Sequence, residues 1–187
     1  MNAEIDISKT ELKTRRLTIC SERIDCPMTV RAYRTDDIQQ MTAIWNEVVE
    51  QGIAFPQEEP LDERTAEPFF SSQSRSAVAV DDSGRVVGLY ILHPNNVGRC
   101  GHLSNASYAV ASGCRGRHIG EELVRDCIKA AGQLGFRILQ FNAVVETNTA
   151  ARRLYEKIGF HQLGVIPGGF RMKDGHYENI CPYYIEL

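Results

Sequence analysis

Residues 115–120 read Arg115-Gly116-Arg117-His118-Ile119-Gly120 and lie between a strand-like run and a strongly amphipathic helical pattern. The strand-like run covers residues 102–110, and apolar side chains recur at helical spacing over residues 119–134. The first N–H groups of a helix have no intrahelical partner, and the helix dipole favours negative charge there. Gly116 and Gly120 allow the backbone to approach an anion closely, and two arginines add positive charge. The sequence therefore predicts a diphosphate site at the start of this helix.

Other phosphate-binding motifs fit this stretch poorly. The G-x-G-x-x-G pattern of Rossmann dinucleotide sites is not reproduced, and no mononucleotide-fold pattern precedes it. The phosphate loop of NTPases is excluded because no Gly-Lys-Ser/Thr sequence occurs. Taken alone, the stretch also allows a second interpretation, in which Gly116 forms a simple turn beside solvated arginines.

Two motifs, one in this loop and one downstream, occur in the same order as in a known family. The loop fits the pattern Val-x-x-x-x-Arg/Gln-x-x-Gly-x-Gly/Ala at Val110, Arg115 and Gly120, with His118 in place of the middle glycine. The downstream stretch fits Asn-x-x-Ala-x-x-Leu-Tyr-x-x-x-Gly-Phe without gaps, at Asn148, Ala151, Leu154, Tyr155, Gly159 and Phe160. Together they resemble the GCN5-related N-acetyltransferase (GNAT) family, and the resemblance covers residues 28–187.

The resemblance implies a fold, a cofactor and a set of cofactor-binding residues. The implied fold is α/β, an α+β three-layer arrangement with a mixed central sheet, helices on both faces and splayed central strands. The implied cosubstrate is acetyl-CoA, whose pantetheine arm lies between the splayed strands and whose diphosphate lies on the glycine loop. The residues implied to bind it are Tyr108, Ala109, Val110, Arg115, Gly116, Arg117, His118, Ile119, Gly120, Glu121, Asn148, Ala151 and Tyr155.

Tyr155 is also implied by the family to be the general acid that protonates the coenzyme A thiolate. A phenol with a pKa of about 10 suits a thiolate with a pKa of about 8.5 only where the environment narrows the gap. The alternative for this tyrosine is a half-buried packing role on its helix.

Three further polar residues are candidates for catalysis: Asn105, Asn142 and Glu146. Asn142 lies in an apolar strand-like run, where a buried amide without partners costs about 1–3 kcal/mol, so a function is expected of it. The pattern around these residues looks like the yeast proline-analogue (azetidine-2-carboxylate) acetyltransferase branch, which implies that both asparagines bind a small amino-acid-like substrate. Alternatively, the amides only satisfy the splayed strands. Glu146 is either a base or a carboxylate favoured by the following helix.

Periodicity and turn residues predict one domain over residues 28–187, with residues 1–27 as an N-terminal extension. The predicted element order is β-α-α-β-β-β-α-β-α-β-β. The expected strands cover residues 29–34, 77–80, 86–92, 102–110, 136–145, 161–166 and 180–187, with the glycine-rich residues 167–170 as a connection. The expected helices cover residues 36–51, 61–71, 119–134 and 148–157.

Composition limits the classes of partner. The net charge of −3, with Lys and Arg spread along the chain, argues against binding to nucleic acid or to an anionic membrane surface. Six cysteines show no CxxC pair and no zinc-ligand spacing, so no metal is expected. We interpret them as reduced thiols of a cytoplasmic protein, because the sequence shows no signal peptide. A small-molecule amine is the expected partner, and a homodimer is left open.

These observations predict an N-acetyltransferase that moves an acetyl group from acetyl-CoA directly to the amine of a small metabolite or amino-acid analogue. Acetylation of a protein or peptide is the alternative activity. A non-catalytic acetyl-CoA sensor is the alternative from a different functional class.

Overall fold

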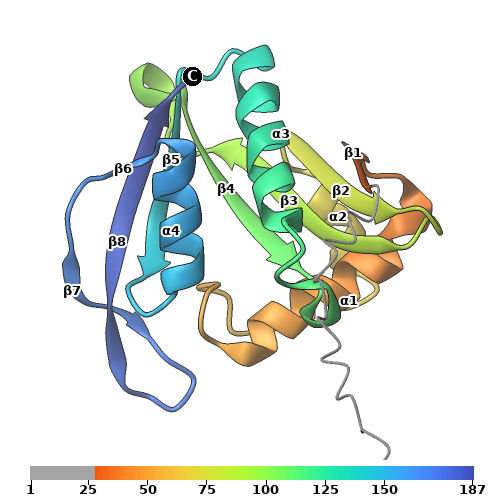
Figure 1. The fold of residues 1–187 in the computed structure, drawn as a ribbon, viewed down its shortest axis with the longest axis horizontal. Coiled ribbons are helices and arrows are strands. Elements are labelled where there is room, and N and C mark those ends of the chain that lie inside the picture. Colours follow the sequence, from red (N-terminus) through yellow and green to blue (C-terminus); the bar gives the residue numbers. More distant parts are fainter. Residues whose placement is uncertain (1–27) are drawn as a thin grey trace, which may run out of the picture.

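The computed structural model describes residues 28–187, which form an eight-stranded mixed sheet and four α-helices (Figure 1). The strand order is β1-β2-β3-β4-β5-β8-β6, with β7 paired to β8. The strands are β1 (Met28–Ala32), β2 (Arg75–Asp81), β3 (Val86–Pro94), β4 (Leu103–Val110), β5 (Ile138–Val145), β6 (His161–Gln162), β7 (Ile166–Arg171) and β8 (Tyr177–Glu186). The helices are α1 (Ile38–Gln51), α2 (Ala66–Ser71), α3 (Ile119–Gln133) and α4 (Thr149–Ile158). The predicted extension, residues 1–27, lies outside the described residues.

Two helices cover each face of the sheet, so the predicted three-layer mixed fold is confirmed (Figure 1). On one face, Trp45 of α1 and Phe70 of α2 pack against Leu89 of β3. On the other face, apolar side chains of α3 and α4 pack on β3, β4 and β5, with Leu123 and Leu139 fully buried. Burying each large side chain of this kind contributes about 1.5–3 kcal/mol, which makes the helical stripes sufficient to fix both outer layers.

The two central strands diverge, as predicted. β4 and β5 run parallel and pair only at Leu103 with Ile138 and at Ser104 with Leu139. Beyond Ser104 the strands separate, and Figure 1 shows them spreading toward the end at which α3 begins. A register shift in the β5–β8 ladder between Phe141 and Val144 bends β5 over the same stretch. Residues 105–110 of β4 are therefore left with one hydrogen-bonding edge that faces no strand.

The C-terminal strands differ from the prediction. β6 is limited to His161–Gln162, and the stretch predicted as a connection forms β7 instead. Glycine and proline are unfavourable inside a regular strand, but they are tolerated at an edge and at bulges. β7 has both properties, since it pairs with β8 alone and its register shifts between Ile166 and Phe170. A Cβ on Gly169 would lie 2.5 Å from Ile180 Cγ1, so a side chain at this position would collide with β8.

The second helix is shorter than predicted because Asp62 forms a turn of its own. Asp62 Oδ1 accepts hydrogen bonds from the backbone N–H groups of Arg64, at 2.9 Å, and Thr65, at 2.8 Å. The helix then begins at Ala66 rather than at residue 61. The segment between α1 and this turn carries Phe55, which is buried against Trp45 with the ring centroids 4.3 Å apart.

Candidate active site

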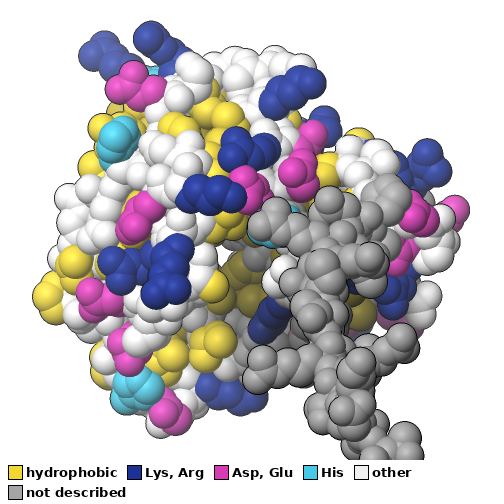
Figure 2. Space-filling model, in the orientation of Figure 1, with side chains coloured by type: hydrophobic (Ala, Val, Ile, Leu, Met, Phe, Trp, Pro, Cys, Tyr) yellow, Lys and Arg dark blue, Asp and Glu magenta, His cyan; other side chains and the backbone are white. Residues whose placement is uncertain are grey.

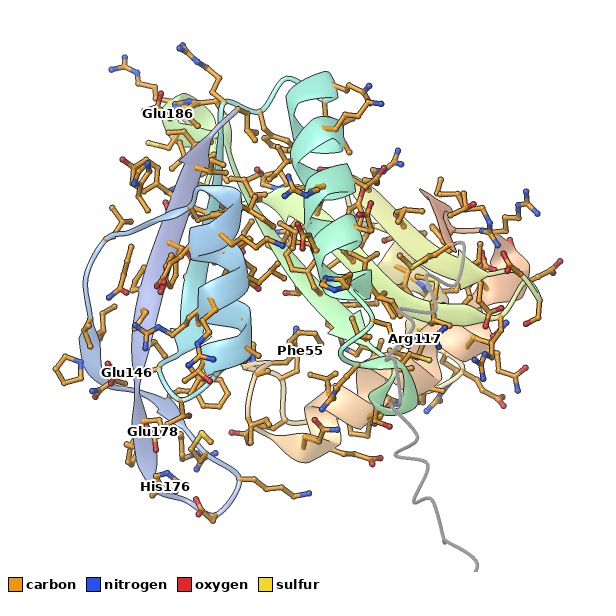
Figure 3. All side chains as sticks on the ribbon, viewed as in Figure 1. Phe55, Arg117, Glu146, His176, Glu178 and Glu186 are labelled. Carbon is orange, nitrogen blue, oxygen red and sulfur yellow. The ribbon has the colours of Figure 1, made fainter. Side chains whose placement is uncertain are left out.

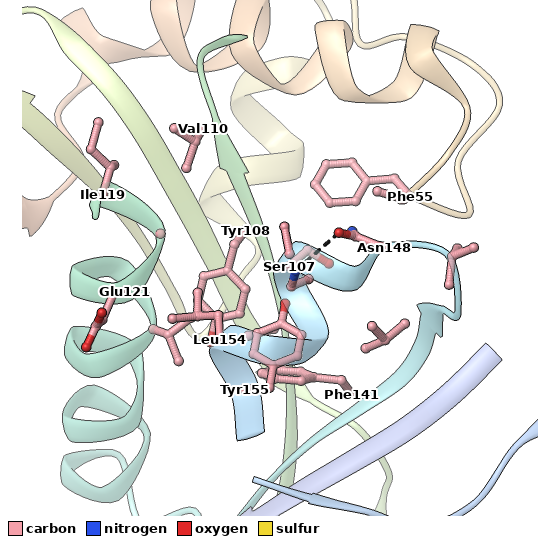
Figure 4. Close-up of a pocket in the computed structure, with 18 of the residues that line it drawn as sticks. Phe55, Ser107, Tyr108, Val110, Ile119, Glu121, Phe141, Asn148, Leu154 and Tyr155 are labelled. Carbon is pink, nitrogen blue, oxygen red and sulfur yellow. Dashed lines mark hydrogen bonds between the residues drawn. The ribbon is translucent and has the colours of Figure 1, made fainter. Parts of the chain in front are cut away.

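A cavity of about 620 Å³ opens where β4 and β5 diverge. Residues of β4, β5, α3, α4 and the loop after α1 line it, and Figure 4 shows Tyr108, Phe141, Tyr155 and Phe55 around it. In Figure 2 a hollow lies at the same place, with hydrophobic side chains inside it. Of the residues predicted to bind the cofactor, all except Ala109 and Arg117 thus come together around one space.

The free edge of β4 presents alternate backbone groups to the cavity. Ala111 N–H donates to Val87 O at 3.1 Å, and Asn95 N–H donates to Leu103 O at 2.8 Å. Because an antiparallel ladder alternates, the odd-numbered residues of β4 bond to β3 and the even-numbered ones face the gap. Tyr108 and Val110 therefore present their N–H and C=O groups to the gap. The prediction for Ala109 is wrong, since its backbone groups face Leu89 of β3.

The loop before α3 carries the expected row of unpaired donors. Within residues 28–187, the N–H groups of Gly116, Arg117, His118, Ile119 and Gly120 make no backbone hydrogen bond. The N–H of Glu121 was also predicted to bind the diphosphate, but it donates to His118 O at 3.0 Å. The Arg115 side chain lines the cavity and donates to Gln51 Oε1 at 3.0 Å. Five free N–H groups at a helix N-terminus form a site suited to an anion.

His118 replaces the family's glycine without removing the turn. Its φ of 60° makes it the single non-glycine residue with positive φ in the described part of the chain. Asparagine, aspartate and histidine enter this left-handed region more readily than other non-glycine residues. The imidazole is 66% exposed, and its Nδ1 lies 3.7 Å from Glu121 Oε2. The side chain therefore points along the first turn of α3, and the backbone at 118 retains the conformation that a glycine would adopt.

Glu121 connects the two helices on this face. Its carboxylate lies 2.6 Å from Lys157 Nζ on α4 and 2.8 Å from Arg125 Nη2 on α3. Hydrogen bonds from Lys157 and Arg125 lower the pKa of the Glu121 carboxyl to about 2. Glu121 therefore stays ionised and holds its cations beside the diphosphate loop, rather than acting as a base.

Tyr155 lies on α4 with its ring against the cavity wall (Figure 4). Its ring centroid is 4.5 Å from that of Phe141 and 5.6 Å from that of Phe160. Burial raises the pKa of the Tyr155 phenol above its ordinary value, so the hydroxyl carries its proton at neutral pH. Two turns earlier, Asn148 Oδ1 caps α4 by accepting from Ala151 N–H at 3.2 Å, the dashed line in Figure 4.

The asparagines on the opposite side of the cavity have partners of their own. Asn105 Oδ1 accepts from Ala106 N–H at 2.8 Å, which satisfies one free donor of the β4 edge. Asn142 is exposed, so the expectation of a buried amide is wrong. The bulge in β5 turns it outward, where it exchanges hydrogen bonds with Asn95 and accepts one from Gln140 at 2.9 Å. Both side chains still line the cavity.

Glu146 does not line the cavity, and its side chain accepts a hydrogen bond from Asn179. Its Oε2 accepts from Asn179 Nδ2 at 2.7 Å, and its N–H donates to Asn179 O at 2.8 Å. Figure 3 shows Glu146 beside β8 and well apart from Phe55. Glu146 thus fixes the end of β5 to β8. This role differs from both alternatives considered for it, a catalytic base and a carboxylate favoured by the following helix.

Several cavity residues were not predicted as functional, notably Phe55, Ser107 and Phe141. For Phe55, the one available signal in the sequence was weak: an aromatic residue beside a proline in a loop. Over residues 28–187, no cluster of three His, Cys, Asp or Glu side chains is placed to hold a metal ion. No helix in the same range is long and apolar enough to cross a membrane.

Comparisons with known proteins agree with this geometry. The model of the acetyltransferase (GNAT) family matches residues 39–160. The N-acetyltransferase aca1 of Schizosaccharomyces pombe is 28% identical over 162 residues, covering 78% of this chain and 77% of that protein, which supports the resemblance to the yeast branch.

Solved structures give the same result. A GCN5-related N-acetyltransferase from Kribbella flavida is 34% identical, with a TM-score of 0.80, over 86% of this chain and 98% of that chain. The phosphinothricin acetyltransferase of Sinorhizobium meliloti, solved in complex with acetyl-CoA, shares the fold with a TM-score of 0.80 at 23% identity, over 86% and 88% of the two chains. The chain belongs to the acetyltransferase (GNAT) family, whose members are acyltransferases.

Proposed function

We propose that this protein transfers the acetyl group of acetyl-CoA directly to the amine of a small metabolite or amino-acid analogue. One observation carries the proposal: a single cavity is lined by four of the five residues with unpaired N–H groups, by the free edge of β4 and by Tyr155. Acetyl-CoA supplies the acetyl group as an activated thioester. The phosphinothricin acetyltransferase that shares the fold acts, by its name, on a small amine, which supports this class of acceptor.

The residues present fit acetyl-CoA. The N–H groups from Gly116 to Gly120 would hold the diphosphate, and Arg115 adds charge at the cavity wall. The backbone of Tyr108 and Val110 would bind the amide groups of the pantetheine arm, as a strand would. Ala151 and the Asn148 amide line the same cavity from α4 and would orient the arm there.

Tyr155 is proposed as the acid. As the bond between the amine nitrogen and the acetyl carbon forms, the phenol donates its proton to the sulfur that leaves. The raised pKa of Tyr155 keeps the proton on the oxygen and widens the gap to an ordinary thiol, so the transfer requires that burial in the same cavity also raise the pKa of the leaving thiol. The amine proton passes to water in the open part of the cavity, and the tyrosine regains its proton from the same solvent.

The acceptor side of the cavity is polar but uncharged. The charged or titratable groups along the described lining are Arg115, His118, Glu121, Cys114 and the tyrosines, and the charged ones come from the α3 side. Asn105, Ser107 and Asn142 provide amide and hydroxyl groups on the other side. A site of this kind disfavours a bound ammonium ion, so it favours the neutral amine that the reaction requires.

Release of free thiol from acetyl-CoA across a panel of amines tests the proposal. Amino acids, their cyclic analogues, phosphinothricin and short peptides are compared at equal concentration with an amine-free control. Selective turnover of a small amine supports the proposal. Turnover of peptides alone would reassign the protein to peptide acetylation, and tight acetyl-CoA binding with no turnover would favour a sensor.

Two further proposals concern the whole protein. Assembly as a homodimer is tested by light scattering across a concentration series, and a cytoplasmic location by imaging of the tagged protein. Neither alters the chemistry of the cavity proposed above.

A further inference from the structure

The gap between β4 and β5 has a closed end. The last residue pair of the two strands joins Ser104 to Leu139, and both side chains are fully buried. Ser104 Oγ also donates to Ile138 O at 2.9 Å, which ties the strands together there. Two residues further along each strand, Ala106 of β4 and Phe141 of β5 line the cavity. On the face covered by α3 and α4, these two residues are the part of the lining closest in sequence to the last strand pair.

Phe141 is held in this end wall by other aromatic rings. Its ring centroid lies 4.5 Å from that of Tyr155, 4.6 Å from that of Phe160 and 5.8 Å from that of Tyr108. Figure 4 shows the rings of Phe141 and Tyr155 next to one another. Ala106 belongs to the same hydrophobic cluster and is buried like Phe141. Because protein interiors are close-packed, a wall of this kind yields little to a larger group.

The polar groups proposed to bind acetyl-CoA lead toward this wall. The unpaired N–H groups of the loop lie where α3 begins, at the open end of the gap (Figure 1). The free backbone groups of Val110 and then Tyr108 follow along β4 toward the closed end. A cofactor held by its diphosphate at the loop and by its arm along β4 would thus direct its acyl group toward Ala106 and Phe141. Tyr155, the proposed acid, contacts Phe141 at the same end.

We propose that Ala106 and Phe141 set the length of the acyl group that this protein transfers, and that they restrict it to the two carbons of acetyl. The proposal rests on the acetyl transfer proposed above. The methyl group of Ala106 and the ring of Phe141 bound the space from the two strands, so each further methylene of the donor must displace a packed ring. One additional methylene in an apolar pocket typically changes selectivity by roughly 10–200-fold.

The experiment compares acetyl-CoA, propionyl-CoA and butyryl-CoA as donors to one acceptor amine. Ala106→Gly removes one methyl group from the wall, and Phe141→Leu replaces its ring by a shorter side chain. Ala77→Gly is the matched control for the first, because Ala77 is a fully buried alanine of β2 that does not line this cavity. Phe160→Leu is the control for the second, because Phe160 stacks on Phe141 without lining the cavity.

Wild type is expected to use acetyl-CoA roughly 10–200-fold better than propionyl-CoA in kcat/KM, and butyryl-CoA no better than propionyl-CoA. Ala106→Gly and Phe141→Leu are each expected to reduce the acetyl-to-propionyl ratio roughly tenfold. Both controls keep the wild-type ratio, even where the melting temperature falls. Equal use of the two donors by wild type overturns the proposal, as does a ratio that the wall variants leave unchanged or that the controls reduce equally.

A binding measurement separates this proposal from the acetyl transfer itself. Titration calorimetry of the three acyl-CoA donors in the absence of an acceptor requires no turnover. Wild type is expected to bind acetyl-CoA more tightly than butyryl-CoA, and Ala106→Gly to reduce that difference. This result without turnover of any amine would refute the proposed activity and keep the acyl site. Equal affinity of wild type for the three donors, or tighter binding of butyryl-CoA, refutes the acyl site.

Discussion

His118→Gly tests whether the diphosphate loop works through its backbone. The left-handed conformation of His118, at φ 60°, costs an ordinary L-residue about 1–2 kcal/mol, and glycine would remove that cost. Glycine also gives the unfolded chain more freedom, which offsets about 0.5–1 kcal/mol. The contact of the exposed imidazole with Glu121 at 3.7 Å contributes little. The net expectation is a gain of roughly 0–1 kcal/mol in the free energy of unfolding, or up to about 3 °C in melting temperature.

Acetyl-CoA affinity is the decisive measurement for the same variant. Because the five N–H groups remain in place, His118→Gly is expected to keep or improve the Kd measured by calorimetry. Gly116→Ala is the control in the opposite direction, because it places an ordinary residue at a left-handed position with φ 78°. The added Cβ would meet nothing within 4 Å, so a loss of about 1 kcal/mol in binding free energy would report backbone strain alone. A tenfold loss of affinity in His118→Gly, with the melting temperature retained, would show that the imidazole binds the cofactor itself.

Three other substitutions test the remaining groups of the site. Tyr155→Phe is expected to lower kcat by roughly 10²–10⁴-fold with little change in the Kd of acetyl-CoA, because it removes the acid but keeps the ring. Steady-state kinetics across pH would reject the proposed role of Tyr155 if kcat were unchanged. Asn142→Ala is expected to raise the acceptor KM several-fold, and wild-type acceptor kinetics would exclude a role in substrate binding. Glu121→Gln is expected to destabilise the fold at neutral pH. The pKa of Glu121 is about 2 in the folded state and about 4.3 in the unfolded state, so the ionised carboxylate stabilises the fold at pH values above about 4.3. The difference in stability between wild type and variant therefore shrinks as the pH falls from about 4.5 to 2. A difference in melting temperature that persists at pH 2 would contradict this reasoning.

Local patterns were sufficient to predict most of the fold. Met41, Trp45 and Val48 recur at helical spacing because one face of α1 must be buried, and the same physics marks α3. The loop at 115–120 was predicted as an anion site from its glycines and arginines before a helix start, with a simple turn as the alternative, and within residues 28–187 five of its N–H groups make no backbone hydrogen bond. The family motifs then placed Asn148 and Tyr155 around the same cavity.

The errors arose where long-range geometry decides the outcome. The exposure of Asn142 depends on a bulge in β5 that is measured against β8, and no local pattern contains that register. The partner of Glu146, Asn179, lies on a different strand far along the chain. The orientation of the Ala109 backbone depends on which residue of β3 lies opposite, a choice that a shift of one residue would reverse.

The divergence of β4 and β5 also makes the sheet two half-sheets that share two residue pairs. Neighbouring amide protons of β4 should consequently differ in hydrogen exchange, although they belong to one strand. The amide protons of Ser107 and Ala109 are hydrogen-bonded to β3, while those of Tyr108 and Val110 face the cavity. A cofactor arm that bridges the gap would connect the two half-sheets. It would slow hydrogen exchange at alternate amides of β4 and reduce the motion of one half-sheet relative to the other.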